Sequence, residues 1–296
     1  MPKHIGEREE NLFIALHDLV FVDYDYLKDY VFIHEDGTKF HKNTIMNHLR
    51  SLEREGYIKS FPVAKPNVRG ADRLVYTLDT KGIQEARELL GEADWDTRWT
   101  QRTPTYIYHS LKMANILTVY KNAEKSGIEF HDYFSERRAF RNYGEWKEDK
   151  DGKKRQSSNT VIRPDGAFIL KRVLNGKTFH FLYFVEMERS RQRIENTLEK
   201  IYRYNQYVRK KSYENDLRFG VPIHMVRVLF VSEKSNERDR LMLNAKKGDS
   251  REIEKINGGL LFATYDDVIE NPYGDIWKAK HSSDSDKLFS LTNKIE

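Results

Sequence analysis

The stretch "RPDGAFILKRVLNGKTFHFLYFVEMERS", residues 163–190, constrains the fold more than any other part of the chain. It holds two apolar runs, each long enough for a strand, on either side of Asn175-Gly176. Asn-Gly is the preferred dipeptide of the type I′ turn that closes a two-residue β-hairpin. Such a turn pairs Leu174 with Lys177 and thereby fixes the partner of each residue along both strands. We therefore expect a long antiparallel hairpin in this register.

Three acidic residues fall where this hairpin would otherwise be apolar. The register puts Asp165 opposite Glu186 and Arg163 opposite Glu188, and alternation along the strands puts the three carboxylates on one face. Opposed carboxylates repel each other across a strand pair. A shared proton, Arg163 or a divalent cation would relieve this repulsion, and hard oxygen ligands suit Mg²⁺ or Mn²⁺. The alternative is an exposed end of the sheet at which the acids pair with Arg163 and Arg189.

The first hundred residues show a different pattern. Helical spacing of apolar residues predicts helices in residues 7–22 and 23–32, and a third from His41 to Gly56, a typical C-cap. The third has an apolar stripe of Ile45, Met46, Leu49 and Leu52. Two strands around a polar turn follow, and another helix begins in "TLDTKGIQEARELLG". Three helices followed by a basic two-stranded ribbon is the pattern of a winged helix-turn-helix domain, which we expect at residues 1–98.

Charge within this domain favours contact with double-stranded DNA. Residues 1–100 hold 14 Lys and Arg against 18 Asp and Glu, whereas residues 37–74 hold 8 against 3. A local basic patch predicts phosphate contact better than total charge does. The third helix fits the major groove, and basic residues of the ribbon neutralise phosphates. The alternative is a protein-docking module with solvated charges. The predicted DNA-binding residues are Lys42, Asn43, Asn47, His48, Arg50, Lys65, Arg69 and Arg73.

The rest of the chain predicts a second domain, residues 103–277, after a linker in which Trp95 and Trp99 pack on a domain surface. A helix over residues 104–127 precedes a strand, a charged loop over residues 142–159 and the hairpin. A basic helix over residues 191–211, further strands and one more helix follow. This order predicts a mixed sheet with flanking helices. Residues 278–296 are expected to form a polar tail with a docking segment at "KLFSL".

The motifs "RPDGAFIL" and "FLYFVEMERS" resemble the PD-(D/E)xK nuclease superfamily. This resemblance implies metal ions on Asp165 and Glu186 that polarise the scissile phosphate, while a third residue helps to activate water. That third residue is usually Lys, and here it is Glu188. Lys200, in the helix after the hairpin, is our candidate to replace it, and Tyr204 and Gln206 are weaker candidates.

Several motifs in order resemble the replication-relaxation family of plasmid and mobile-element proteins: "YHSLKMANILTVY", "SERRAF", "RPDGAFIL", "FVEMERS" and "TLEKIYRYNQY". The family implies a role in plasmid replication or DNA relaxation. By position, Glu136 in "SERRAF" would bring another carboxylate, and a further metal ligand, towards the site; its alternative role is an ion pair with a nearby Arg. The expected fold is α+β, a winged helix-turn-helix followed by an αβββαβ mixed-sheet PD-(D/E)xK-like domain.

Other sequence features exclude several classes of function. The chain has no Cys, which excludes disulfides, thiolate nucleophiles and Cys-ligated zinc. No stretch reaches the roughly 18–20 uncharged apolar residues of a bilayer crossing. The chain holds no P-loop, as a P-loop motor would need, and no G-x-S-x-G nucleophile elbow. It also lacks the His-x-His pair of a tyrosine relaxase of the histidine-metal type. We expect a cytoplasmic protein with no membrane partner and leave a homodimer open.

Two functions stay open. The chain nicks or cleaves DNA as a Mg²⁺- or Mn²⁺-dependent endonuclease, or it is a non-catalytic DNA-binding accessory or regulator with a degenerate nuclease fold.

Overall fold

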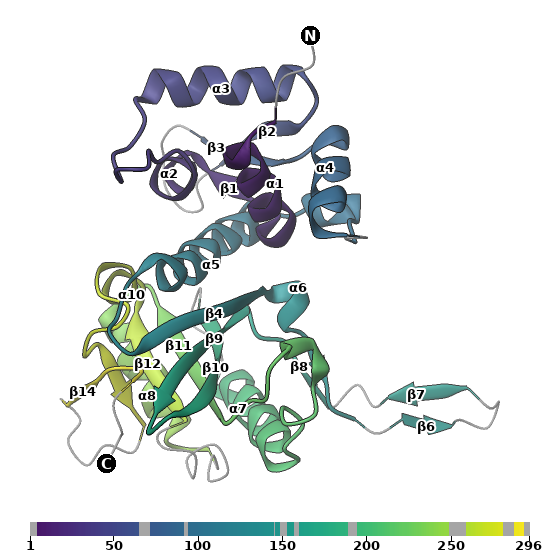
Figure 1. Ribbon diagram of the computed structural model, residues 1–296. Helices are drawn as coiled ribbons and strands as arrows, with labels where there is room; N and C mark the ends of the chain where they lie inside the picture. The colour runs from purple at the N-terminus through teal and green to yellow at the C-terminus, as the bar shows by residue number, and fades with distance from the viewer. Residues whose placement is uncertain are drawn as a thin grey trace. The chain divides into compact units, whose positions relative to one another are not determined.

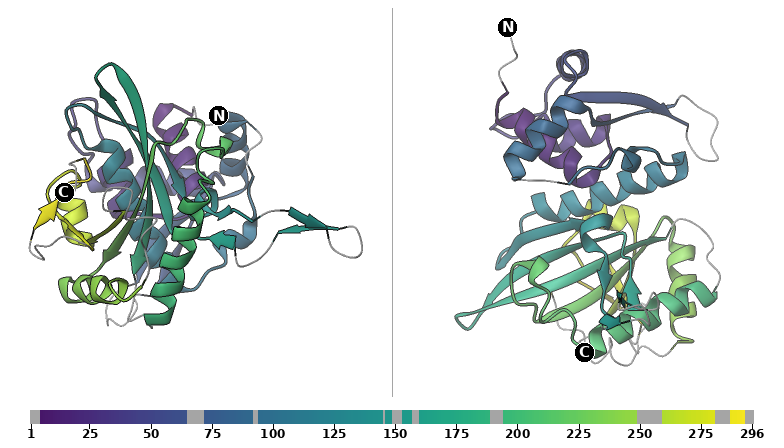
Figure 2. Two further views of the ribbon diagram at one scale, coloured as in Figure 1. Left: turned by 90° about the horizontal axis from the view of Figure 1, so that it is seen from below. Right: turned by 90° about the vertical axis from the view of Figure 1, so that its right-hand side faces the viewer.

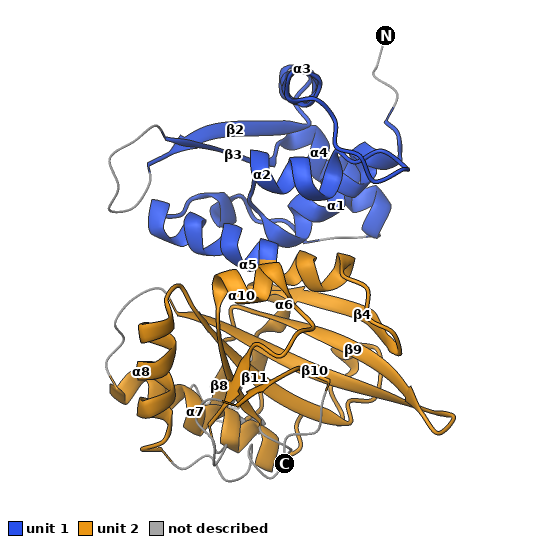
Figure 3. Cartoon of the chain, turned by 90° about the vertical axis from the view of Figure 1, so that its left-hand side faces the viewer, with its two compact units in different colours: residues 1–115 blue, residues 116–296 orange. Residues whose placement is uncertain are grey.

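The computed structural model describes residues 5–64, 72–91, 94–144, 146–148, 153–156, 160–188, 194–248, 259–280 and 287–292. They form two compact units, residues 1–115 and 116–296 (Figure 3). The division falls inside helix α5 (Pro104–Asn122) and not at the expected linker. Trp95 and Trp99 do pack on the core of the first unit, with their rings edge to face.

The first unit combines helices with a three-stranded sheet (Figure 1). Its sheet has the order β1-β3-β2, with β1 as a short strand that the sequence pattern did not predict. The other elements fall within the ranges expected for the helices and the ribbon. In chain order they are α1 (Glu7–Leu19), β1 (Val22–Asp23), α2 (Tyr24–Tyr26), η1 (Leu27–Val31), α3 (Lys42–Arg54), β2 (Ile58–Val63), β3 (Arg73–Leu78) and α4 (Thr80–Leu90).

Helix α3 is amphipathic in the way its sequence predicts. Ile45, Leu49 and Leu52 are fully buried, while Met46 is only partly buried. Asp79 is the N-cap of helix α4, and its carboxylate accepts a hydrogen bond from Thr80 N at 2.8 Å. At Gly82 the helix runs so close to the Tyr57 carbonyl that no side chain fits there. The absence of a Cβ at this position therefore sets how closely α4 packs on the turn before β2.

The second unit is built on a mixed seven-stranded sheet of order β14-β13-β12-β11-β10-β9-β4. β10 runs parallel to β11, and β11 to β12, while the other neighbours are antiparallel. This is an α+β architecture. Its strands are β4 (Ile128–Ser135), β9 (Gly166–Leu174), β10 (Lys177–Glu188), β11 (Met225–Ser232), β12 (Leu260–Thr264), β13 (Trp277–Ala279) and β14 (Leu288–Phe289).

The predicted hairpin is present in the predicted register. Leu174 pairs with Lys177, and the pairing continues to Gly166 with Val185. Asn175 and Gly176 both have positive φ, 51° and 74°, as a type I′ turn requires.

The expected pairing of Arg163 with Glu188 is wrong, because β9 begins only at Gly166. The Arg163 guanidinium instead lies 5.5 Å from the centre of the Phe140 ring.

Helices pack on both faces of this sheet. Helices α7 (Ile194–Arg209) and α8 (Ser235–Ala245) share a core with Leu182 and Phe184 of β10. On the other face, Tyr120 stacks on Phe168 with ring centres 4.4 Å apart. Glu186 and Glu188 follow Phe184 at every second position of β10. They therefore lie on the same face of the strand as Phe184, the face that α7 covers.

Two segments differ from their expected irregular structure. Part of the charged stretch 142–159 forms an antiparallel pair, β6 (Trp146–Glu148) with β7 (Lys154–Gln156), that projects from the unit (Figure 2). In the expected polar tail, β14 pairs with β13, and the Leu291 carbonyl accepts hydrogen bonds from Tyr183 and Arg227. The "KLFSL" segment thus docks on the sheet of its own chain.

The remaining short elements are η2 (Thr97–Thr100), α6 (Glu136–Ala139), β5 (Arg141–Asn142), β8 (Val161–Ile162), η4 (Leu217–Phe219) and α10 (Tyr265–Glu270).

A candidate active site on strand β10

Asp165 is fixed to the end of the central hairpin by backbone hydrogen bonds. Its own N–H donates to the Val185 carbonyl at 3.0 Å. Its Oδ2 accepts a hydrogen bond from the Met187 N–H at 2.8 Å. Strand pairing has ended at Gly166, so the Asp165 side chain takes up the ladder position that a backbone carbonyl would otherwise fill. Asp165 and Glu186 therefore lie at the same end of the hairpin, although strand pairing ends at Gly166 with Val185, one position before the predicted pair of Asp165 with Glu186.

Glu186 and Glu188 converge on one lysine. Both side chains are 2% exposed. Lys200 Nζ, on α7, lies 2.8 Å from Glu186 Oε2 and 3.0 Å from Glu188 Oε1. Tyr204, one turn further along α7, donates its hydroxyl to Glu186 Oε1 at 2.6 Å. Lys200 thus contacts both carboxylates, and Tyr204, a weaker candidate of the sequence analysis, contacts Glu186 directly.

Burial and charge work against each other in this cluster. Burial raises the pKa of Glu186 to about 7, against the opposing effect of the Lys200 charge. Burial alone would lower the pKa of Lys200, but Glu186, Glu188 and Asp165 raise it well above its usual value. Lys200 therefore stays charged at neutral pH, whereas Glu186 is divided between its two protonation states. A group that titrates near neutral pH is suited to proton transfer.

The donor set fits a hard cation chemically. Asp165, Glu186 and Glu188 offer carboxylate oxygens, the ligands that Mg²⁺ and Mn²⁺ prefer. Glu188 Oε2 is buried without a hydrogen-bond partner among the described residues. The same is true of the hydroxyl of Ser232, the residue of β11 that pairs with Glu188 of β10. In the described part of the chain, however, no three His, Asp or Glu side chains are already spaced as a metal site. Glu186 and Glu188 are held by the Lys200 ammonium, and Asp165 is held by the Met187 N–H.

Glu136 begins helix α6 directly after Ser135, which pairs with Gly166. It thus lies at the same end of the sheet as Asp165, with its side chain exposed.

The sequence signal that predicted the carboxylate cluster as a whole was the hairpin register. Ser232 had no such signal, because its position follows only from the pairing of β10 with β11.

In the first unit, α3 carries a polar face opposite its buried stripe. Asn43, Asn47 and Arg50 recur at helical spacing with Arg54, and all four are exposed. Lys42 is also exposed, with its ammonium 5.9 Å from the centre of the Tyr24 ring. These residues keep the placement that a groove-facing helix requires.

Other predicted DNA-binding residues have different positions. His48 turns away from the polar face: its Nε2 lies 2.6 Å from Glu9 Oε1, and its ring packs edge to face on Phe32. Arg73 pairs with the buried Asp23 at 2.6 Å and with Asp25 at 3.4 Å. Lys65 and Arg69 lie outside the described residues.

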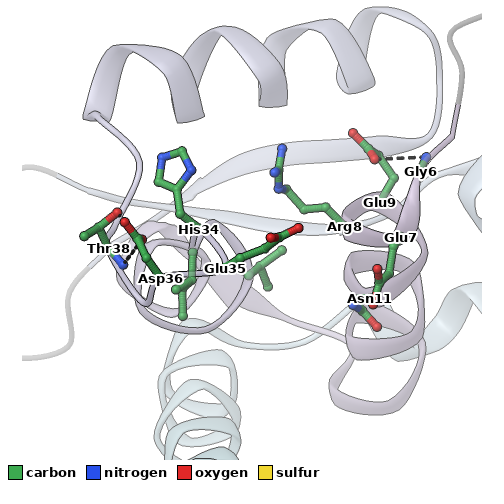
Figure 4. Close-up of a pocket in the computed structure, with 11 residues that line it drawn as sticks. Gly6, Glu7, Arg8, Glu9, Asn11, His34, Glu35, Asp36 and Thr38 are labelled. Atoms are coloured by element: carbon green, nitrogen blue, oxygen red, sulfur yellow. Dashed lines mark hydrogen bonds between the residues drawn. The ribbon is translucent and has the colours of Figure 1, made fainter.

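The first unit also has a hollow of about 1010 Å³, drawn in Figure 4. Glu9 at its edge accepts a hydrogen bond from Gly6 N, and Asp36 accepts one from Thr38 N. Carboxylates outnumber cations around it, so it does not suit a phosphate. The charged residues of its lining are Glu7, Arg8, Glu9, Glu35 and Asp36.

Comparison with known proteins gives one family. The model of the replication-relaxation family matches residues 15–221, which is more than half of the chain. The comparison with curated proteins found no match. Among solved structures, restriction endonuclease FokI is similar with a TM-score of 0.29 and 12% identity, over 91% of this chain and 45% of that one. A similarity this low carries no argument, and the chain spans less than half of that protein. No described helix has the length and apolar character of a membrane span.

Proposed function

This chain belongs to the replication-relaxation family, and we propose that it binds double-stranded DNA and cleaves phosphodiester bonds in it. The family indicates a role in the replication or relaxation of a plasmid or mobile element. The finer proposal is a metal-dependent nick or cut made by the second unit. The single observation that supports it is the convergence of Glu186, Glu188 and Lys200 beside Asp165.

This cluster has the residue types of a PD-(D/E)xK site, with the lysine contributed by a different element. Glu188 occupies the strand position at which the superfamily usually has Lys. Lys200 approaches the same carboxylates from α7 and supplies the missing positive charge. The proposed fold of the second unit is therefore PD-(D/E)xK-like.

Each residue has a role that its environment supports. Asp165 and Glu186 would hold Mg²⁺ or Mn²⁺, with Glu136 as an outer candidate, and the ion would neutralise charge on the scissile phosphate. Lys200 places a permanent positive charge where negative charge develops on the phosphate. The unpartnered Glu188 Oε2 accepts a proton from the attacking water. Tyr204 orients Glu186 through its hydroxyl.

For the first unit we propose a winged helix that contacts DNA through α3. The exposed Asn43, Asn47 and Arg50 face base edges, and Lys42 contacts phosphate. His48 and Arg73 instead stabilise the unit through their pairs with Glu9 and Asp23. Lys65 and Arg69 keep their proposed role as phosphate contacts of the wing.

One observation favours a second function, that of a DNA-binding accessory without catalysis. Lys200 already neutralises Glu186 and Glu188, so the cluster is stable as an ion-paired structural element. A scaffold of this kind would keep the carboxylates without cleaving DNA.

A nicking experiment separates the two functions. Supercoiled plasmid is incubated with Mg²⁺ or Mn²⁺ and with wild type, Asp165→Ala or the control Asp266→Ala, an exposed acid on α10. The nuclease proposal expects open circles with wild type and with the control, and none with Asp165→Ala. Equal duplex binding by all three proteins without any nicking would instead establish the accessory function.

A further inference from the structure

Two adjoining hollows of about 480 Å³ and 390 Å³ run beside helix α7 of the second unit. Each lies within the range of roughly 300–1,000 Å³ that small-ligand sites occupy. Tyr143 lines both, so the two hollows adjoin at this residue, and together they are called the groove. The first hollow is also lined by Tyr202, Arg203, Gln206 and Lys210, and the second by Arg141, Tyr207, Leu217 and Arg218.

The groove offers aromatic and apolar surface to solvent. Tyr202 is 58% exposed, and Leu217 is 93% exposed. Tyr143 is half-buried, with the Lys210 ammonium 5.6 Å from its ring centre. Exposed rings alternating with cations form the surface on which the bases of a single nucleic-acid strand stack.

Positively charged side chains line the same groove. Arg203, Lys210 and Arg218 reach the groove, and the acids there, Glu199 and Asp216, already pair with arginines. The guanidinium groups pair with acids of their own chain, but each presents more N–H donors than one carboxylate accepts. The groove therefore keeps a surplus of positive charge and of donors, which favours a polyanion.

Two buried donors in the second hollow have no partner among the described residues. Tyr207 and Arg141 are each 1% exposed, and the structure gives no hydrogen bond to Tyr207 Oη or to Arg141 Nη2. Arg141 is held in place by its ion pair with Asp216 and by the Phe219 ring, 4.4 Å from the guanidinium carbon. A buried donor without an acceptor costs free energy, so such atoms indicate a site for an acceptor-rich ligand.

We propose that this groove binds a single-stranded segment of nucleic acid, with bases on Tyr143 and Tyr202 and phosphates at Arg203, Lys210 and Arg218. Helix α7 also carries the half-buried Lys200 and the buried Tyr204 on the neighbouring stripe, so the bound strand lies alongside the carboxylate cluster. A role of this groove in cleavage rests on the proposed function, whereas the binding of a single strand in the groove does not.

The test measures binding of fluorescent oligothymidylate to the full chain by anisotropy, in EDTA, so that no cleavage takes place. Tyr202→Ala and Lys210→Ala are compared with exposed controls: Leu243→Ala on α8 and Lys246→Ala at the C-cap of that helix. We expect Tyr202→Ala to weaken binding about tenfold, the usual effect of one lost stacking platform. Lys210→Ala should weaken binding and flatten its dependence on salt.

An unfolding midpoint of the second unit equal to that of wild type shows that the variants are folded. Duplex binding should also be unchanged, since the proposed duplex contacts lie on α3 of the first unit. Affinity for the single strand within twofold of wild type in both Tyr202→Ala and Lys210→Ala overturns the inference, whether or not plasmid is nicked. Loss of strand binding in these variants alone supports it, even if wild type proves unable to nick.

Discussion

Lys200 Nζ lies 2.8 Å from Glu186 Oε2, so a lysine on helix α7 reaches a carboxylate on strand β10. Asp165 is bonded to the backbone of that same strand through Met187. In the proposed nuclease site, the strand acids and this helix lysine together supply the charges that a PD-(D/E)xK nuclease draws from its hairpin.

Replacing this lysine should slow catalysis strongly and leave DNA binding intact. We expect Lys200→Met to lower the nicking rate by about 10²–10³-fold, because a preorganised charge at the phosphate is lost. The control is Lys171→Met, which removes an ion pair with the exposed Glu129 elsewhere in the sheet. Nicking by Lys200→Met at the rate of the control would remove Lys200 from the proposed mechanism.

Glu186 should make the second unit less stable as pH rises. Its pKa is about 7 in the folded chain, against an ordinary value of 4.5, and the main cause is burial. Between these values the folded state holds a proton that the unfolded state has lost. The stabilising contribution is therefore complete below about pH 4.5 and is lost as pH rises through about 7. The shift corresponds to about 3 kcal/mol.

Glu186→Gln removes this dependence. Hydrogen exchange of β9 and β10 peptides across pH 4.5–7.5, corrected for intrinsic rates, should show wild type losing stability relative to the variant. Glu129→Gln is the control: the hydrogen bond from Lys171 lowers the pKa of Glu129, so the contribution of Glu129 changes only below about pH 4.5 and the variant should keep the wild-type dependence on pH in this range. If the protection of these peptides changes with pH in parallel for wild type and Glu186→Gln, Glu186 is ionised throughout this range.

The polar face of α3 should carry duplex binding. Arg50→Ala is expected to weaken binding and to reduce the slope of log K against log salt by about 0.9 if it contacts one phosphate. Arg87→Ala, an exposed arginine on α4, is the matched control. An unchanged affinity and slope for Arg50→Ala would indicate that α3 docks a protein.

Gly82→Ala should destabilise the first unit selectively. The added methyl would overlap the Tyr57 carbonyl oxygen, so α4 would have to move. We expect a loss of about 1–3 kcal/mol, seen as a lower unfolding midpoint in the Trp95 and Trp99 fluorescence. Gln84→Ala, exposed on the same helix, should keep the wild-type midpoint. A wild-type midpoint for Gly82→Ala would mean that α4 yields at no cost.

The sequence predicted what local rules determine. The Asn175-Gly176 turn predicted the hairpin register correctly as far as the pair of Gly166 with Val185, because the type of turn sets the pairing of the strands that it joins. Helical spacing predicted α3 and its buried Leu49 for the same reason.

Tertiary contacts set the rest. His48 pairs with Glu9, which lies 39 positions earlier, and no local pattern signals that pair. The hydrogen bond from Tyr204 to Glu186 depends on how α7 packs on the sheet. Strand β14 was assigned to a polar tail because its two residues are too few to show a period.

Cleavage by the carboxylate cluster is tested most directly in a single turnover. An end-labelled duplex, fully bound by excess protein, is exposed to Mn²⁺, and the cleaved fraction is followed for wild type and Glu186→Gln. Our account predicts cleavage by wild type and a rate at least about 100-fold lower for Glu186→Gln at equal occupancy. Intact DNA with wild type, or equal cleavage by both proteins, would contradict it.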